Sequence, residues 1–164
     1  MNSKEALDRL LRSYMQYYDV NKETPIEPFT SFASFQSLEH GYWLVKKATI
    51  SDSETREYIY FYDAPHIDLE TVNRLENLAW EDGMSRVQPH PQHRNTDVFV
   101  IFIGETVDED AMEAVKKLHH YKSYKMMFQG WSNFGSVALD LSSGKASYNR
   151  FGSRLKKVLK SIIK

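Results

Sequence analysis

The sequence predicts a single α/β (α+β) domain over residues 1–164, in which helices cover the faces of a mixed β-sheet. Two observations favour this fold class. Apolar residues recur at helical spacing in some segments and gather with aromatic and β-branched residues in short runs between them. A strand–helix–strand unit also spans 57–103, and such a unit favours parallel strands joined by a crossover helix. The expected order is α-β-β-β-α-β-α-β-β-α.

The first half of the chain is expected to begin with a helix over residues 3–19. Asn2 and Glu5 fit a capping box, and apolar residues then recur at helical spacing. The prolines of "NKETPIEP" end this helix, because proline cannot continue the hydrogen-bond ladder. Three strands follow, over 29–37, 42–50 and 57–63, and the last two favour an antiparallel hairpin.

The second half is expected to begin with a helix over 68–82 that Asp68 caps, followed by a central strand over the apolar run 97–103. Thr106 and Glu109 fit a capping box that opens a third helix. The segment "GWSNFG" predicts a bend between two strands. The remaining elements are strands 123–129 and 136–142, a segment 145–149 that pairs back, and a final amphipathic basic helix.

Charge is distributed unevenly along the chain. Residues 1–113 contain 10 Lys and Arg against 21 Asp and Glu, whereas residues 114–164 contain 11 Lys and Arg and Asp140 as their one acid. Such asymmetry indicates either an anionic partner or neutralisation within the fold or across a self-association contact, and we favour neutralisation.

The absence of cysteine excludes disulfides, thiolate nucleophiles and cysteine-bound metal clusters. The N-terminus has no apolar signal core, and the longest apolar run, 98–103, is too short to span a bilayer. We therefore expect a soluble cytoplasmic protein without a membrane span. Phosphate-loop, nucleophile-elbow and HExxH patterns do not occur in the sequence, and nothing in it calls for a cofactor.

Three stretches carry a family resemblance: "YWLVKKATI…ETREYIYFY", "HRNTDVFVIFIG" and "KMMFQGWSNFGSVALDLSSGKASYNRFGSRL". Together they resemble an uncharacterised bacterial family of small soluble proteins, a domain of unknown function, and this resemblance implies no activity. More distantly, the chain is similar to the soluble domain that precedes the membrane part of some bacterial rhomboid proteases. That second likeness implies a restriction-endonuclease-like fold without the catalytic residues.

The nuclease arrangement can be tested on the two strands of the expected hairpin. It requires an acid on one strand and an acid-x-Lys on the next, which together hold a divalent metal ion against a phosphate. The stretch "WLVKKATI" contains no acid, and the residue two positions after Glu57 is Ile59 rather than lysine. A nuclease is therefore disfavoured.

Two groups of residues are candidates for a ligand or metal site. Asp63, His66 and Glu105 follow the carboxyl ends of the two expected parallel strands, where α/β proteins commonly bind ligands. His90 and His93 have a spacing that suits two imidazoles on one metal ion. For both groups the structural interpretation, as caps or loop residues, is the stronger one. Parallel strands would also hold Asp63 and His93 at opposite ends, roughly 20 Å apart.

Two further groups are candidates for contacts with partners. Trp131 and Phe134, in "GWSNFG", provide rigid apolar area of the kind that anchors partners, although aromatic residues of this kind more often fill a core. Basic residues of the last third are candidates for anion binding, although packing of the final helix on its own sheet is the stronger interpretation. The candidates for anion binding are Lys125, Lys145, Arg150, Arg154, Lys156 and Lys157.

These observations favour a non-enzymatic cytoplasmic interaction or regulatory module that binds a protein partner or self-associates. The first alternative is anion or nucleic-acid binding through the basic last third of the chain. The second is a hydrolase or metal-dependent enzyme that uses Asp63 and His66, or His90 and His93. A structure that scatters the basic residues would remove the first alternative, and one that separates the acids and histidines would remove the second.

Overall fold

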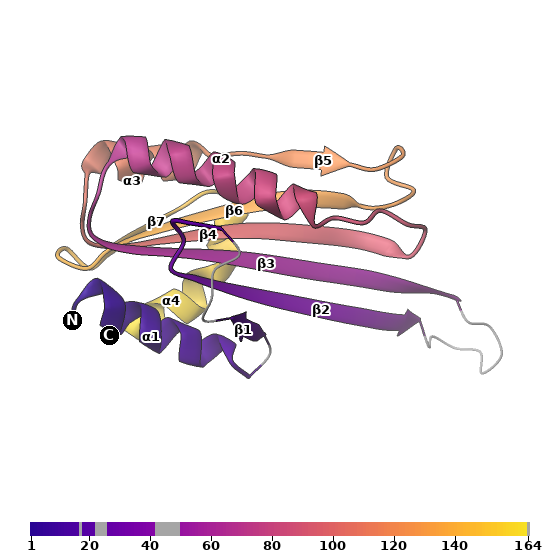
Figure 1. Cartoon of the computed structure of the whole chain (residues 1–164), viewed down its shortest axis with the longest axis horizontal. Coiled ribbons are helices and arrows are strands. Elements are labelled where there is room, and N and C mark those ends of the chain that lie inside the picture. Colours follow the sequence, from indigo (N-terminus) through magenta and orange to yellow (C-terminus); the bar gives the residue numbers. More distant parts are fainter. Residues whose placement is uncertain (17, 22–25, 42–49, 164) are drawn as a thin grey trace.

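A mixed seven-stranded sheet forms the middle layer of the protein, with helices on both of its faces (Figure 1). The computed structural model describes residues 1–16, 18–21, 26–41 and 50–163. The helices are α1 (Ser3–Tyr14), α2 (Leu69–Ser85), α3 (Glu109–Lys117) and α4 (Lys156–Ile163), with a short 3-10 helix, η1 (Gly152–Leu155), directly before α4. The strands are β1 (Asp19–Asn21), β2 (Ser31–Gly41), β3 (Ile50–Ile67), β4 (His93–Val107), β5 (Tyr121–Ser123), β6 (Trp131–Asp140) and β7 (Lys145–Tyr148).

The strands lie in the order β1-β2-β3-β4-β6-β5, and β7 also pairs with β6. Strands β3, β4 and β6 are parallel, whereas β1 and β2 at one side and β5 and β7 at the other are antiparallel to their neighbours. Because β4 occupies one edge of β6 along its whole length, β5 and β7 share the other edge. β5 pairs near Trp131 at the start of β6, and β7 pairs near Asp140 at its end.

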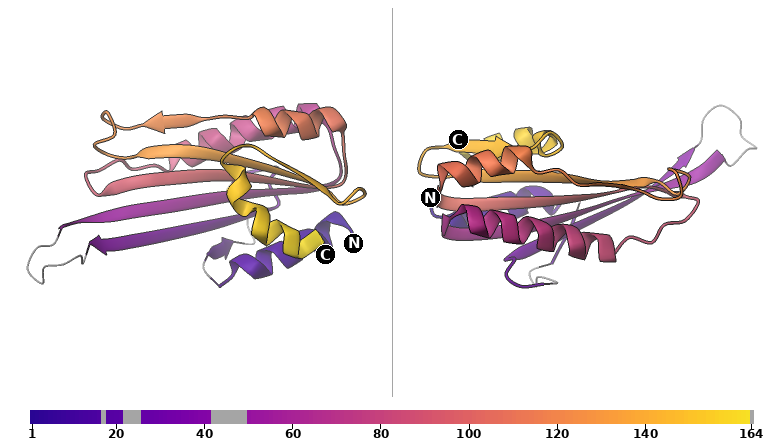
Figure 2. Two further views of the ribbon diagram at one scale, coloured as in Figure 1. Left: turned by 180° about the vertical axis from the view of Figure 1, so that it is seen from behind. Right: turned by 90° about the horizontal axis from the view of Figure 1, so that it is seen from above.

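Alternation along the central strands divides the core into two clusters. Tyr60 and Val100 point to the face that α2 and α3 cover, and Phe61 and Ile101 point to the face that α1 and α4 cover. Figure 2 shows α2 and α4 on opposite sides of the sheet, with α1 and α4 over one end of their face. Strands that are apolar on both faces are the expected centre of such a three-layer fold.

Most of the predicted architecture is confirmed. The fold class and the order of elements agree with the structure, and residues 57–63 and 97–103 do lie on parallel neighbouring strands. Asn2 and Glu5 form the expected capping box, and Asp68 caps α2 by accepting a hydrogen bond from the Thr71 backbone N–H at 2.8 Å. Helix α4 packs its apolar stripe in the core.

Two predicted strand arrangements are wrong. Glu57 to Phe61 pair with Ser31 to Phe35 on one side and with β4 on the other, so 42–50 cannot be their hairpin partner. Residues 42–49 themselves lie outside the described residues. The segment 130–135 is not a bend, because β6 begins at Trp131 and continues through it.

Three predicted boundaries are also wrong. The helix expected over 3–19 ends at Tyr14. The capping box at Thr106 does not form, because Thr106 lies within β4 and its hydroxyl donates to the Pro65 carbonyl at 3.3 Å. The strand expected over 123–129 extends only from Tyr121 to Ser123, and a turn follows it. In each case a tertiary contact or a local turn overrides the periodic pattern.

The side chain of Asn149 fills the gap that β5 and β7 leave on the outer edge of β6. Its Nδ2 donates to the Phe134 carbonyl at 2.9 Å and its Oδ1 accepts from the Ser136 backbone N–H at 2.9 Å, as a neighbouring strand would. The same amide donates to the Leu118 carbonyl after α3 and accepts from the Gly152 N–H at the start of η1. Asn149 therefore fastens β6 to two other segments.

We predict that Asn149→Ala lowers the free energy of unfolding by about 2–4 kcal/mol, because it leaves several buried backbone groups without partners. Urea unfolding of both proteins measures the change. The control is Asn77→Ala, which removes an exposed asparagine of α2 that bonds only within its own helix. Equal effects of the two substitutions would contradict the role assigned to Asn149.

Candidate functional site

Asp63, His66 and Glu105 lie at the edge of the sheet where the sequence places them, but they do not form one site. Asp63 points to the α1 face and accepts a hydrogen bond from the Ser3 hydroxyl at 3.4 Å. His66 is exposed and pairs with Asp108 at 3.2 Å. No contact described for these residues joins the three side chains, and the acid that His66 meets is Asp108 rather than Asp63 or Glu105.

His90 and His93 have separate partners. His90 Nε2 lies 2.5 Å from Oε2 of Glu54, a buried carboxylate. His93 is 4% exposed, its Nδ1 lies 2.6 Å from the Gln129 carbonyl oxygen, and its Nε2 lies 2.8 Å from Thr96 Oγ1. A carbonyl can only accept, so Nδ1 donates to it, and the threonine hydroxyl occupies Nε2. Both nitrogens are therefore occupied, and nowhere in the described part of the chain do three His, Asp or Glu side chains gather as metal ligands.

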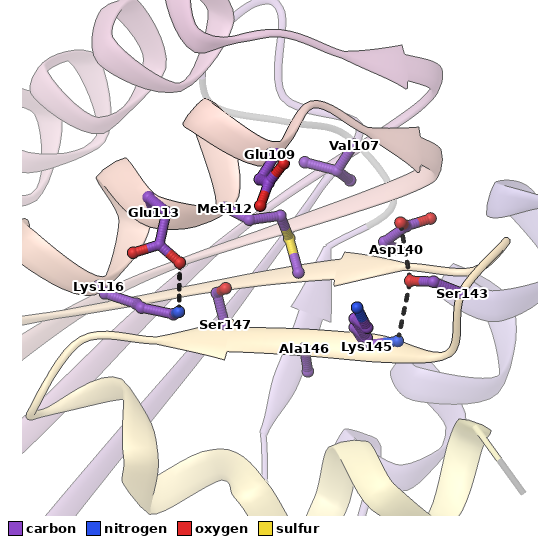
Figure 3. Close-up of a pocket in the computed structure, with 10 residues that line it drawn as sticks. All are labelled: Val107, Glu109, Met112, Glu113, Lys116, Asp140, Ser143, Lys145, Ala146 and Ser147. Carbon is purple, nitrogen blue, oxygen red and sulfur yellow. Dashed lines mark hydrogen bonds and ion pairs between the residues drawn. The ribbon is translucent and has the colours of Figure 1, made fainter.

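A pocket of about 480 Å³ lies between α3 and the β6–β7 hairpin (Figure 3). It opens near the carboxyl ends of β4 and β6, the edge at which the sequence predicts a ligand crevice, but other residues line it. Glu113 pairs with Lys116 at 2.5 Å, and the Ser143 hydroxyl donates to Asp140 at 2.8 Å. Glu109, Glu113 and Asp140 line this pocket together with Lys116 and Lys145, and such a mixed lining does not favour an anion at Lys145.

The basic candidates are scattered over the molecule. Lys125 follows β5 near the start of β6. Lys145, in contrast, lies opposite Asp140 in the strand register, at the end of β6. The two ends of β6, Trp131 and Asp140, are nine residue steps apart, which corresponds to about 30 Å. Lys156 lies over the Tyr148 ring, with its amine 5.4 Å from the ring centroid. One continuous nucleic-acid surface through all six candidates is therefore not formed.

The two aromatic candidates also differ in their surroundings. Phe134 is 2% exposed and packs edge-on against Trp80 and His120, so its ring has no surface to offer a partner. Trp131 at the start of β6 is half-buried. Phe134 is therefore a core residue, as expected if the aromatic residues of "GWSNFG" fill the core.

Among the residues whose exposure the structure describes, the two most exposed large apolar side chains, Met126 and Phe128, lie in the turn that connects β5 to β6. Met126 is 87% exposed, Met127 55% and Phe128 82%. We call residues 125–128 the Met–Met–Phe loop. Three large adjacent apolar side chains in water are uncommon on a protein surface and commonly mark a site of association.

The backbone of the Met–Met–Phe loop is left-handed at three consecutive residues, with φ of 45° at Lys125, 52° at Met126 and 72° at Met127. Each such residue costs about 1–2 kcal/mol relative to an ordinary conformation, because its Cβ crowds the following carbonyl. The turn is closed by the Phe128 N–H, which donates to the Lys125 carbonyl at 3.0 Å. Strain of this kind persists only where the surroundings hold it.

His93 and Gly130 hold the base of the Met–Met–Phe loop. The His93 imidazole donates to the Gln129 carbonyl, and the His93 ring packs edge-on against Tyr124 on the other side of the loop. Gly130 has φ +84°, and a Cβ there would lie 2.2 Å from the Arg94 carbonyl oxygen. The buried histidine that resembled a metal ligand thus positions the exposed loop.

The loop is not predicted from the sequence, because "KMMF" falls within a segment whose composition favours a strand. Left-handed turns are usually recognised in a sequence by a glycine or an asparagine, and residues 125–127 contain neither. The sequence signal that could have revealed the loop is its composition, since three large apolar residues lie in a basic region without acids.

Two carboxylates, Glu57 and Asp97, lie side by side on β3 and β4 at the end of the α1–α4 face. Tyr18 donates its hydroxyl to Glu57. Asp97 is 2% exposed and accepts from Asn133 Nδ2 at 3.2 Å and from Asn95 Nδ2 at 2.9 Å. Sequence spacing does not reveal this pair, because only the register of the parallel strands brings the two residues together.

Burial raises the pKa of both carboxyl groups above the ordinary range, since it disfavours the charged form. The negative charge of Asp97 raises the pKa of Glu57 further, and Arg154, whose Nη1 lies 3.7 Å from Asp97 Oδ2, opposes both shifts. A raised carboxyl pKa means that the native state holds its proton to higher pH than the unfolded state. Stability therefore falls as pH rises from the ordinary carboxyl pKa through the raised one.

We predict that Glu57→Gln raises the melting temperature at neutral pH, because it removes a half-buried charge and keeps an acceptor for Tyr18. The gain should shrink as pH falls toward the ordinary glutamate pKa, where the native protein already holds that proton. Thermal unfolding across this pH range measures it. Glu81→Gln, at an exposed position of α2, is the control. A gain that does not change with pH would contradict this prediction.

Comparisons with known proteins place the chain in a family without adding a function. No curated protein and no solved structure matches it, so the likeness to the rhomboid-protease domain has no support. In the described part of the chain, no helix is both long enough and apolar enough to cross a bilayer. The family described as Domain of unknown function (DUF8052) matches residues 2–161, and the protein therefore belongs to that family.

Proposed function

We propose that this protein is a non-enzymatic cytoplasmic interaction module that docks on an anionic membrane surface through the Met–Met–Phe loop. The observation that carries the proposal is the exposure of three adjacent apolar side chains on a turn that the fold holds in a strained conformation. A loop held in this way loses little conformational entropy on binding, which favours association.

The shape of the loop favours a lipid surface over a flat protein surface. Met126 and Phe128 are more than four-fifths exposed, so they project from the molecule rather than form part of a plane. A projecting apolar tip can insert between lipid headgroups, whereas on a protein it needs a matching cavity. Full burial of each such side chain contributes about 1.5–3 kcal/mol.

The charge around the loop favours anionic lipids. Lys122 and Lys125 are exposed beside it, and residues 114–139 contain no Asp or Glu. Each lysine near an anionic bilayer contributes about 1 kcal/mol, and the cytoplasmic leaflet is the anionic one. Apolar insertion and charge attraction together are the usual basis of peripheral membrane binding.

We predict that the wild-type protein sediments with vesicles containing equal parts of phosphatidylserine and phosphatidylcholine, and less with phosphatidylcholine alone. Met126→Ser combined with Phe128→Ser should lower binding to the anionic vesicles by about tenfold or more, because two inserted side chains are lost. Added salt should weaken binding by screening the lysines. Cosedimentation at several lipid concentrations measures each effect.

A matched control uses two methionines of equal exposure. Met127 and Met15 are both 55% exposed, but Met15 follows α1 and lies outside the loop. Met127→Ser should weaken vesicle binding, whereas Met15→Ser should not. Equal binding by all variants would overturn the proposal. So would a wild-type dimer that the double variant dissociates in light scattering, since the loop would then serve self-association.

A further inference from the structure

A pocket of about 430 Å³ opens on the outer edge of β6, beside the gap that Asn149 fills. We call it the β6-edge pocket. Its walls come from β6, from the segment between α3 and β5, and from the segment between β7 and η1. The lining residues used below are Leu118, His119, Arg150, Phe151 and Arg154. Its volume lies within the range of small-molecule sites.

The side chains that line the β6-edge pocket are cationic or uncharged. Arg150 and Arg154 contribute two guanidinium groups, and the lining includes no Asp or Glu. Arg154 is stacked on Phe151, with its Cζ 4.6 Å from the ring centroid, and its side chain remains 61% exposed. The nearest acid described for it is Asp97, whose Oδ2 lies 3.7 Å from Arg154 Nη1.

Several hydrogen-bond donors of the pocket have no protein acceptor. Arg150 and His119 are exposed, and the described interactions give their side chains no carboxylate partner. His120, in contrast, is already bound to Glu76 at 2.5 Å. The pocket therefore combines two guanidinium groups, one of them with no other partner, and apolar walls from Leu118 and Phe151.

We propose that the β6-edge pocket binds a small phosphate monoester with a compact aromatic body. Guanidinium groups present parallel N–H donors that match phosphate oxygens, and two of them suit a dianion. The aromatic body would lie against Leu118 and the edge of the Phe151 ring, because that ring is already stacked on Phe99 and covered by Arg154. A nucleic-acid backbone is not the favoured occupant, because Lys125, Lys145, Lys156 and Lys157 do not line the pocket.

The proposal is tested with phenyl phosphate, using inorganic phosphate and phenol as partial probes. Titration followed by amide chemical shifts should show phenyl phosphate binding more tightly than either partial probe, with shifts at residues 118–119 and 149–154. Arg150→Gln should weaken binding by about tenfold or more, because it removes a charged hydrogen bond. Arg150 is exposed, so its loss should leave the fold intact.

Lys157→Gln is the matched control, since it removes one exposed positive charge from α4 outside the pocket. It should leave the affinity for phenyl phosphate unchanged, as should the Met126→Ser, Phe128→Ser double variant. Absence of binding by the wild-type protein would overturn the proposal. Equal weakening by Arg150→Gln and Lys157→Gln would also overturn it, because diffuse electrostatic attraction would then explain the binding.

Discussion

The structure depends on how the outer edge of β6 is completed. Two short strands share this edge, and the gap between them is closed by Asn149, whose side chain bonds Phe134 and Ser136 and whose backbone N–H donates to the Ser136 carbonyl. One amide thereby replaces a strand pairing and also fastens the end of α3 and the start of η1. The β6-edge pocket lies beside this gap and the Met–Met–Phe loop lies beyond β5, so both candidate sites exist because no long strand covers β6.

The elements that the sequence predicts well are those in which local preference and tertiary packing agree. The Asn2 capping box and the Asp68 cap are local interactions, and 97–103 is apolar on both faces because it is the central strand. Thr106 shows the opposite case. Its spacing to Glu109 suits a capping box, but its hydroxyl donates instead to the backbone carbonyl of Pro65 on the neighbouring strand β3.

The candidate sites were less predictable for a physical reason. The Met–Met–Phe loop depends on a histidine more than thirty residues earlier in the chain, and the acid pair depends on strand register. Neither relation produces a recognisable spacing of residues in the sequence. The charge asymmetry of the sequence has one counterpart in the fold, because Arg154 from the basic third lies 3.7 Å from the buried Asp97 of the acidic part.

The exposure of Met126 and Met127 also has a chemical consequence. A chain without cysteine reacts with oxidants mainly at methionine sulfur, and exposed thioethers react first. Conversion of either residue to the sulfoxide would make a polar group of an apolar one at the tip of the turn, and reductases could reverse the change. Affinity for an apolar surface would then follow the redox state of the cell.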